Sequence, residues 1–266
     1  LIRANRAGAY SSRTIIGCNT RKYHGLLIAP QPGIDNENHV LLSNLDEVVI
    51  QHDASFNLGI HKYPGGIYSP GGHKYMRDFS AEPIPNMTYR VGGVVLYKEM
   101  IFAEASDRMM IKYTLLDAHS PTKLRFRPYL AFRNVHRLSK ANFDVNDKHG
   151  KVPNGIRMRL YNGYTPLFMQ FSKKVEYTHV PSWYYNIEYQ EEQERGYDYQ
   201  EDLFVPGFFE VDIRKGESII FCAGTSEVNP ASIKRNYNAE VSKRIPRNNF
   251  ENCLLNSAEQ FITRRG

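Results

Sequence analysis

The sequence predicts an all-β fold, mainly antiparallel, in which two large sheets pack face to face and one or two helices follow at the C-terminal end. Two observations favour this prediction. The 266 residues include 18 tyrosines and 14 phenylalanines, side chains that suit half-buried strands better than helices. Short apolar or alternating runs also follow one another along most of the chain, and Gly, Pro, Asn and Asp separate them.

The predicted strands are short and distributed along most of the chain. In order they span residues 26–29, 40–42, 47–51, 87–91, 94–102, 109–116, 123–132, 155–161, 167–171, 182–190, 208–213 and 218–223. The pairs Gly92-Gly93 and Asn162-Gly163 each lie between two of these runs. Because both pairs supply the positive φ angles that two-residue turns require, each pair predicts a hairpin.

Helical patterns begin after Asn229-Pro230. Residues 231–243 and 250–263 contain no Pro or Gly and carry apolar residues at roughly helical spacing. In the second segment, one apolar stripe is predicted to contain Leu254, Leu255, Ala258, Phe261 and Ile262. Polar residues concentrate at 139–153, which we expect to form a long exposed loop.

Composition limits the class of protein. An apolar fraction of 41% is enough for a substantial core, and no apolar run approaches the roughly 20 residues that a membrane span requires. The first residues lack the basic-then-apolar layout of a signal peptide, so we expect a cytoplasmic protein with no membrane partner. Basic residues gather near the end of the chain without a recognition motif, so the net charge of +6 does not predict a nucleic-acid partner.

Few motifs point to catalysis or to a cofactor. Three cysteines, Cys18, Cys222 and Cys253, lie far apart and predict reduced structural thiols rather than metal ligands. The run Asp144-Val145-Asn146-Asp147 lacks the Gly and the distal Glu of a calcium loop, and no phosphate-binding loop is found. Acidic residues that could form a glycosidase pair are numerous, but solvated turns explain them better. The sequence therefore predicts no catalytic residue, no metal and no cofactor.

One aromatic stretch differs from this background. Residues 183–189 hold the only tryptophan together with several tyrosines, and a charged turn follows at 190–198. Exposed aromatic faces can stack on sugar rings while neighbouring polar side chains bind hydroxyl groups. Strand alternation offers a different interpretation, in which Trp183 and every second residue after it are core residues. From the residues alone, both interpretations stay open.

Several collinear segments carry a family resemblance. They are Asn19-Thr20-Arg21-Lys22-Tyr23-His24-Gly25-Leu26-Leu27, Leu45-Asp46-Glu47, Lys62-Tyr63-Pro64-Gly65, Arg127-Pro128-Tyr129-Leu130-Ala131-Phe132-Arg133, Arg195-Gly196-Tyr197-Asp198-Tyr199-Gln200-Glu201-Asp202-Leu203 and residues 260–266. Together they resemble the N-terminal domain of prokaryotic-type glycogen debranching enzymes, the amylo-α-1,6-glucosidase family. The resemblance extends over nearly the whole chain.

This resemblance implies a supersandwich similar to galactose-mutarotase-like domains over residues 1–228, and a helical linker over residues 229–266. It also implies that the linker leads to an (α/α)6 toroid, absent from this sequence, that hydrolyses the α-1,6 linkage left at a glycogen branch. The catalytic acid and base would then lie beyond Gly266. The expected partners are this catalytic domain and an α-glucan such as glycogen or limit dextrin.

For the domain itself, the resemblance implies a non-catalytic role in which loops support the toroid and reach the rim of its active site. The candidate substrate-binding residues are Arg21, Tyr23, His24, Trp183, Tyr184 and Arg195. Three other functions stay open: an independent glycan-binding module, a mutarotase-like sugar enzyme and a purely structural domain.

Overall fold

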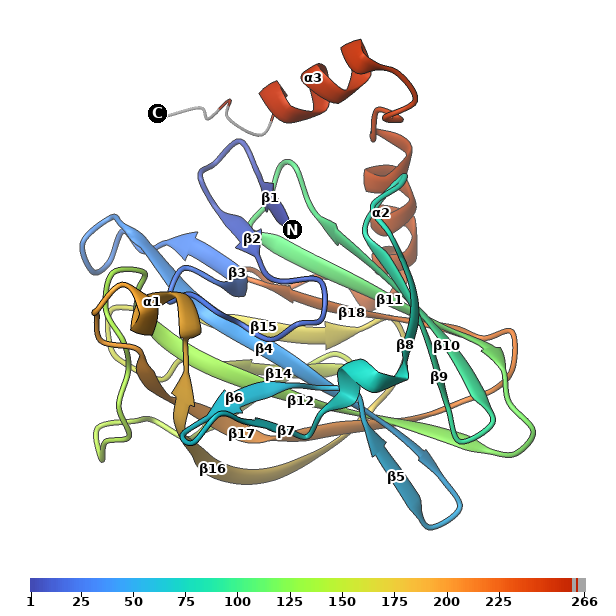
Figure 1. Cartoon of the computed structure of the whole chain (residues 1–266), viewed down its shortest axis with the longest axis horizontal. Helices are drawn as coiled ribbons and strands as arrows, with labels where there is room; N and C mark the ends of the chain where they lie inside the picture. Colours follow the sequence, from blue (N-terminus) through green and yellow to red (C-terminus); the bar gives the residue numbers. More distant parts are fainter. Residues whose placement is uncertain (260–261, 263–266) are drawn as a thin grey trace.

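The computed structural model describes residues 1–259 and 262, which form two large antiparallel sheets that face each other (Figure 1). Sheet 1 has eight strands in the order β1-β2-β3-β4-β12-β17-β16, with β5 paired to β4. Sheet 2 has eight strands in the order β13-β14-β15-β18-β11-β10-β9-β8, and a small sheet joins β6 to β7. The prediction of an all-β, mainly antiparallel fold with two large sheets and C-terminal helices is confirmed.

The bounds of the elements are as follows. Sheet 1 contains β1 (Ile2–Ala4), β2 (Tyr10–Ser12), β3 (Gly25–Pro30), β4 (Asn38–Gln51), β5 (Ala54–Asn57), β12 (Thr122–Asn134), β16 (Glu176–Glu188) and β17 (Gln200–Ile213). Sheet 2 contains β8 (Met76–Ser80), β9 (Asn86–Val91), β10 (Val94–Phe102), β11 (Arg108–Asp117), β13 (His149–Val152), β14 (Gly155–Met158), β15 (Leu167–Phe171) and β18 (Ser218–Gly224). The remaining elements are β6 (His61–Tyr63), β7 (Ile67–Ser69), a 3₁₀ turn (Gly72–Tyr75), α1 (Gln190–Glu194), α2 (Pro230–Ser242) and α3 (Phe250–Glu259).

The main core lies between the two sheets and is built largely from alternate side chains of their strands. In β12, Leu124 and Phe126 point into this core, and the residues beside them are partly exposed. Phe126 contacts Phe171 of β15 in sheet 2, with ring centroids 5.2 Å apart. Phe171 also contacts Phe209 of β17 in sheet 1, with centroids 5.1 Å apart. Aromatic rings therefore interlock across the sandwich, which accounts for much of the phenylalanine content.

One ion pair crosses this apolar core. Glu47 of β4 accepts hydrogen bonds at Oε1 from Lys98 Nζ of β10, at 2.5 Å, and from the Tyr113 hydroxyl of β11, at 2.6 Å. All three side chains are buried. Burial lowers the pKa of Lys98, and the Glu47 carboxylate opposes that shift only in part. The contact links sheet 1 to sheet 2 through the centre of the sandwich.

The helix α2 packs on the outer face of sheet 2. The Asn229 side chain caps its first turn by accepting a hydrogen bond from the Ala231 N–H at 3.0 Å. Its buried residues Ile233 and Tyr237 join an apolar cluster with Met110 and other residues of sheet 2. The segment that follows β18 is therefore attached to the sandwich, and a domain boundary between residues 228 and 229 stays a prediction.

Some strands differ from their predicted bounds. β4 is one long strand where two were predicted, because Ser43, Asn44 and Asp46 are polar yet buried and interrupt the apolar pattern. The segment 139–153, predicted to be an exposed loop throughout, contains β13 at its end. The short strands β1, β2 and β5–β8 were not predicted, because they hold few apolar residues.

Of the two predicted tight turns, one is confirmed. Both glycines of Gly92-Gly93 have positive φ, and β9 pairs with β10 directly across them. Asn162-Gly163 was wrongly predicted to be a two-residue turn, because β14 ends at residue 158 and β15 begins at residue 167. The two strands pair as predicted, but through a longer connection.

The last helix is exposed on its apolar side. α3 is described over Phe250–Glu259, and residues 260, 261 and 263 of the predicted helix lie outside the described residues. Leu254 and Leu255 of the predicted stripe are 53% and 47% exposed. Phe261 of that stripe lies outside the described residues. Among the described residues, no helix combines the length and the apolar character that crossing a bilayer would require.

Replacing Glu47 by Gln is expected to lower the free energy of unfolding by about 3–5 kcal/mol, because it leaves the Lys98 ammonium buried without its counter-ion. Urea denaturation followed by circular dichroism measures the change. Glu99→Gln is the matched control: Glu99 pairs with Lys112 at 2.9 Å in a partly exposed position, so a loss of about 0–1 kcal/mol is expected. Equal losses in the two variants would contradict a special role for the core ion pair.

Candidate functional site

Loops from distant parts of the chain meet over the outer face of sheet 1 (Figure 1). They are the loop 13–24 between β2 and β3, the hairpin β6–β7, the segment 135–139 after β12, and α1 with the residue before it. Each contributes a side chain to one apolar cluster on that face: Tyr23, Tyr63, Leu138 and Tyr189. Apolar packing therefore brings these loops together, and polar contacts then set their positions.

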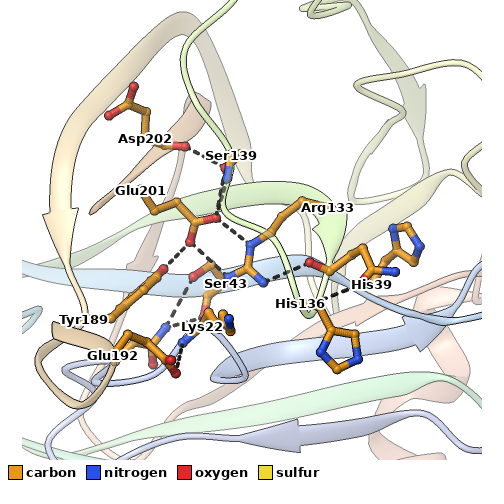
Figure 2. Close-up of polar contacts among 12 residues, drawn as sticks. Lys22, His39, Ser43, Arg133, His136, Ser139, Tyr189, Glu192, Glu201 and Asp202 are labelled. Atoms are coloured by element: carbon orange, nitrogen blue, oxygen red, sulfur yellow. Dashed lines mark hydrogen bonds and ion pairs between the residues drawn. The ribbon is translucent and has the colours of Figure 1, made fainter. Parts of the chain in front are cut away.

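A buried ion pair lies beneath the loops (Figure 2). Arg133 of β12 donates from Nε to Glu201 Oε1 at 2.5 Å and from Nη2 to Glu201 Oε2 at 3.0 Å. Glu201, in β17, is fully buried, and Arg133 is 5% exposed. Burial by itself would lower the pKa of Arg133, but the paired carboxylate outweighs burial and raises that pKa. The guanidinium therefore stays charged inside the protein.

The same carboxylate holds two of the loops. Ser139 donates to Glu201 Oε1 from both its N–H and its hydroxyl, each at 3.0 Å. The hydroxyl of Tyr189, the residue before α1, donates to Glu201 Oε2. Burial, followed by the neighbouring carboxylate, raises the pKa of Tyr189 well above its usual value. Glu201 thus fixes both the segment after β12 and the start of α1 (Figure 2).

The loop 13–24 is held by its own polar residues. Asn19 Nδ2 donates to the carbonyl and to the hydroxyl of Ser43 in β4, both at 3.3 Å. The Thr20 N–H donates to His24 Nδ1 at 3.1 Å, so the imidazole acts as an acceptor. Burial, helped by nearby cationic groups, lowers the pKa of His24 to about 4. At neutral pH, His24 therefore closes the loop as an uncharged side chain.

On its other side, the loop is fastened to α1. The Glu191 N–H donates to the Thr20 carbonyl at 3.0 Å, and the Lys22 N–H donates to Glu192 Oε1 at 3.3 Å. The Arg21 guanidinium pairs with the Glu191 carboxylate at 3.3 Å, and both side chains are nearly half exposed. Because such a pair contributes little stability, Arg21 remains able to bind a ligand.

Cationic and aromatic side chains gather at the exposed edge of these loops. The Tyr23 hydroxyl lies 3.1 Å from His136 Nδ1. Lys22 Nζ and the Arg195 guanidinium each lie 5.3 Å from the centre of the Tyr197 ring, which is 53% exposed. We call Arg21, Lys22, Tyr23, Arg195 and Tyr197 the rim cluster. It combines hydrogen-bond donors with aromatic faces, which suits a ligand that has both hydroxyl groups and apolar faces.

The predicted site residues are only partly brought together. Arg21, Tyr23, His24 and Arg195 gather around α1. Tyr184 packs on the same face of sheet 1, beside Tyr129, with ring centroids 4.9 Å apart. Trp183 packs toward the main core and meets Phe204 edge-on at 5.3 Å. Neighbouring residues of a strand point to opposite faces, so Trp183 and Tyr184 do not share a surface.

Two buried pairs on this face of sheet 1 had no predicted role. One is Arg133–Glu201, and the other joins Asp46 of β4 to His61 of β6, whose Nε2 lies 3.0 Å from Asp46 Oδ1. The Asp46 pair holds the β6–β7 hairpin on sheet 1, and Gly59 is required beside it, because a Cβ there would lie 2.4 Å from the carboxylate. The sequence feature that could have indicated these pairs is a charged residue inside an apolar strand, because a buried charge needs a partner.

Three buried carboxylates on this face pair with basic side chains. The pairs are Arg133–Glu201, His61–Asp46 and Lys62–Glu188, the last at 3.5 Å. Glycoside hydrolysis needs two carboxyl groups about 5–10 Å apart around a bound sugar, and side chains already held by cations are poorly suited to it. Within residues 1–259 and 262, no group of three or more His, Cys, Asp or Glu side chains is placed to hold a metal ion.

The low pKa of His24 predicts a loss of stability in acid. As pH falls below about 6.5 the unfolded chain binds a proton at this residue, while the folded protein binds it only near pH 4. The stability that His24 contributes should therefore fall by about 3 kcal/mol between these values, and this contribution should change no further below pH 4. Urea denaturation at several pH values should show a smaller fall for His24→Asn. His73→Asn, at an exposed histidine, should keep the wild-type slope, and equal slopes in all three proteins would contradict the prediction.

A comparison with protein families agrees with the resemblance seen in the sequence. The family model described as "Glycogen debranching enzyme N terminal" matches residues 1–220. Among solved structures, a bacterial glucoamylase complexed with acarbose is similar, with a TM-score of 0.41 and 12% sequence identity. The similarity covers 91% of this chain and 36% of that one, so the chain spans about a third of its length. The search of curated proteins finds no match.

The expected family is thereby confirmed, while the roles of the site residues stay predictions. The matched region includes the loop 13–24, α1 and both residues of the Arg133–Glu201 pair. Because it covers most of the 266 residues, the chain belongs to the N-terminal domain family of glycogen debranching enzymes.

Proposed function

We propose that the chain is the non-catalytic N-terminal domain of a longer debranching enzyme, whose (α/α)6 catalytic toroid hydrolyses α-1,6 branch linkages of an α-glucan. In this proposal the domain supports the toroid and lends the rim cluster to the edge of its active site. The observation that carries the proposal is that Arg21 and Tyr23, both partly exposed, lie on a loop held from below by buried polar contacts, in a chain of this family.

Preorganisation supports the binding role of the rim cluster. The loop 13–24 is fastened to β4 through Asn19 and to α1 through Lys22, and α1 is in turn fixed by Tyr189 on Glu201. A ligand that meets side chains already held in place loses less entropy on binding. The cationic and aromatic side chains would then bind the hydroxyl groups and ring faces of a glucan branch near the toroid.

The position of α3 supports contact with a following domain. α2 packs on sheet 2, whereas Phe250, Leu254 and Leu255 of α3 are 78%, 53% and 47% exposed. Exposed apolar side chains close together mark surfaces that another domain covers. We propose that the toroid packs against this side of α3, so that residues 229–259 connect the two domains.

Glucose release from a branched limit dextrin tests the proposal. The 266-residue chain should release none, and the same protein extended through its downstream residues should release glucose. Loss of the chain's residues 1–228 from the extended protein should lower or abolish that activity, because the toroid loses its support. Glucose release by the 266-residue chain alone would contradict the non-catalytic role.

Substitutions in the rim cluster test its part in glucan binding. In the extended protein, Arg21→Ala and Tyr23→Ala should each lower kcat/KM for glucose release about tenfold, equivalent to about 1.4 kcal/mol. Arg77→Ala is the control, because Arg77 is an exposed arginine on β8 of sheet 2. Unchanged kinetics in the two rim variants, with unchanged melting temperatures, would restrict the domain to a structural role.

A further inference from the structure

A groove runs along the edge of the sandwich, and its lining includes no residue of the rim cluster. β16 is the last strand of sheet 1, and a cavity of about 460 Å³ lies between its residues 181–185 and the segment 141–147. Cavities that bind small organic ligands are usually about 300–1,000 Å³ in volume. The groove is therefore large enough for part of an oligosaccharide.

Aromatic side chains line the groove on both sides. Phe143, on the segment 141–147, is fully exposed, and Tyr185 of β16 is 57% exposed. Trp183 lies between the groove and the core, where its edge-on contact with Phe204 holds the indole in place. Large exposed aromatic side chains that face one cavity are uncommon on a free surface and mark binding sites.

A single carboxylate fixes both sides of the groove. Asp202 of β17 accepts the Asn186 N–H of β16 at Oδ1, at 2.8 Å, and the Ala141 N–H at Oδ2, at 3.0 Å. Asn186 has a φ of 57° and lies in a bulge where the register of β16 shifts. The bulge breaks the strand alternation, which explains why Tyr185 is exposed rather than a core residue as one interpretation of the sequence held. The aromatic side chains therefore stand on backbone that is already ordered.

We propose that this groove is a separate binding site for an α-glucan chain. Polar side chains, Asn142, Asp147 and Ser182, lie among the aromatic ones. A pyranose ring has apolar faces and hydroxyl groups around its edge. The aromatic side chains of the groove can stack on the faces, and the polar side chains between them can bind the hydroxyl groups. The choice of an α-linked glucan rests on the proposed function, whereas the fit to a sugar chain rests on the groove.

Other occupants fit less well. A peptide that extends sheet 1 would need a regular free edge, but Pro181 cannot donate a hydrogen bond and the bulge at Asn186 interrupts β16. An anionic ligand would meet the Asp147 carboxylate, and none of the lysines and arginines that the structure describes lines the groove. A neutral, amphipathic chain remains the best match.

Titration of the 266-residue chain with maltoheptaose tests the site, with Trp183 emission and calorimetry as parallel readouts. Trp183 is the only tryptophan, so a change in its emission reports on the groove itself. We expect saturable binding, and about a tenfold rise in the dissociation constant for Phe143→Ala and for Tyr185→Ala. Phe250→Ala removes an exposed aromatic side chain of α3, outside the groove, and should leave binding unchanged.

The outcomes separate this inference from the proposed function. Absence of saturable binding at millimolar maltoheptaose, or binding that is unaffected by both groove substitutions, would overturn the site. Equal affinity for cellohexaose would overturn the assignment to α-linked glucan. Glucose release by the extended protein is measured independently. If release occurs without groove binding, only the groove inference fails, and if the groove binds maltoheptaose but no glucose is released, only the proposed function fails.

Discussion

The outer face of sheet 1 depends on the buried carboxylate of Glu201. A carboxylate removed from water is strongly destabilising unless its oxygens are hydrogen-bonded and its charge is balanced. Here Arg133 balances the charge, and Ser139 and Tyr189 complete the hydrogen bonds. Because these donors come from separate segments, none of the segments can move away without leaving the charge partly unsatisfied. The loop 13–24 is attached to α1, which Glu201 holds through Tyr189, so the side chains of the rim cluster are ordered although they are partly or fully exposed.

The core of the sandwich contains a second buried carboxylate with a related role. Glu47 links sheet 1 to sheet 2 through Lys98 and Tyr113. Buried ion pairs are often no more stabilising than well-packed apolar residues of similar size, but they tolerate few alternative arrangements. We infer that Glu47 sets how the two sheets face each other, while the interlocking phenylalanines supply most of the packing energy.

Much of the fold could be predicted from the sequence, because aromatic and apolar runs between turn residues are typical of half-buried strands. β10 has the bounds predicted for it, and Gly92-Gly93 forms the predicted turn. The site was harder to predict. The family resemblance pointed to the loop 13–24, but its contact with α1 depends on a short helix that no apolar pattern indicates. Arg133 and Glu201 are 68 residues apart, so no local pattern links them.

The register of β16 explains why Trp183 and Tyr184 are not placed as predicted. Trp183 and Tyr184 were predicted to belong to one group, whereas alternation along the strand sends them to opposite faces. The bulge at Tyr185 and Asn186 then changes the alternation again. Bulges depend on hydrogen bonds to neighbouring strands, here the bond from Asn186 to Asp202, and such bonds cannot be read from one strand alone.

Glu201 and Asp202 are adjacent in β17 and act on opposite faces of the same sheet. The first orders the rim loops, and the second orders both walls of the groove. Because both side chains project from β17, a displacement of this strand would disturb both surfaces together. Variants that displace β17 would thus alter both the rim cluster and the groove.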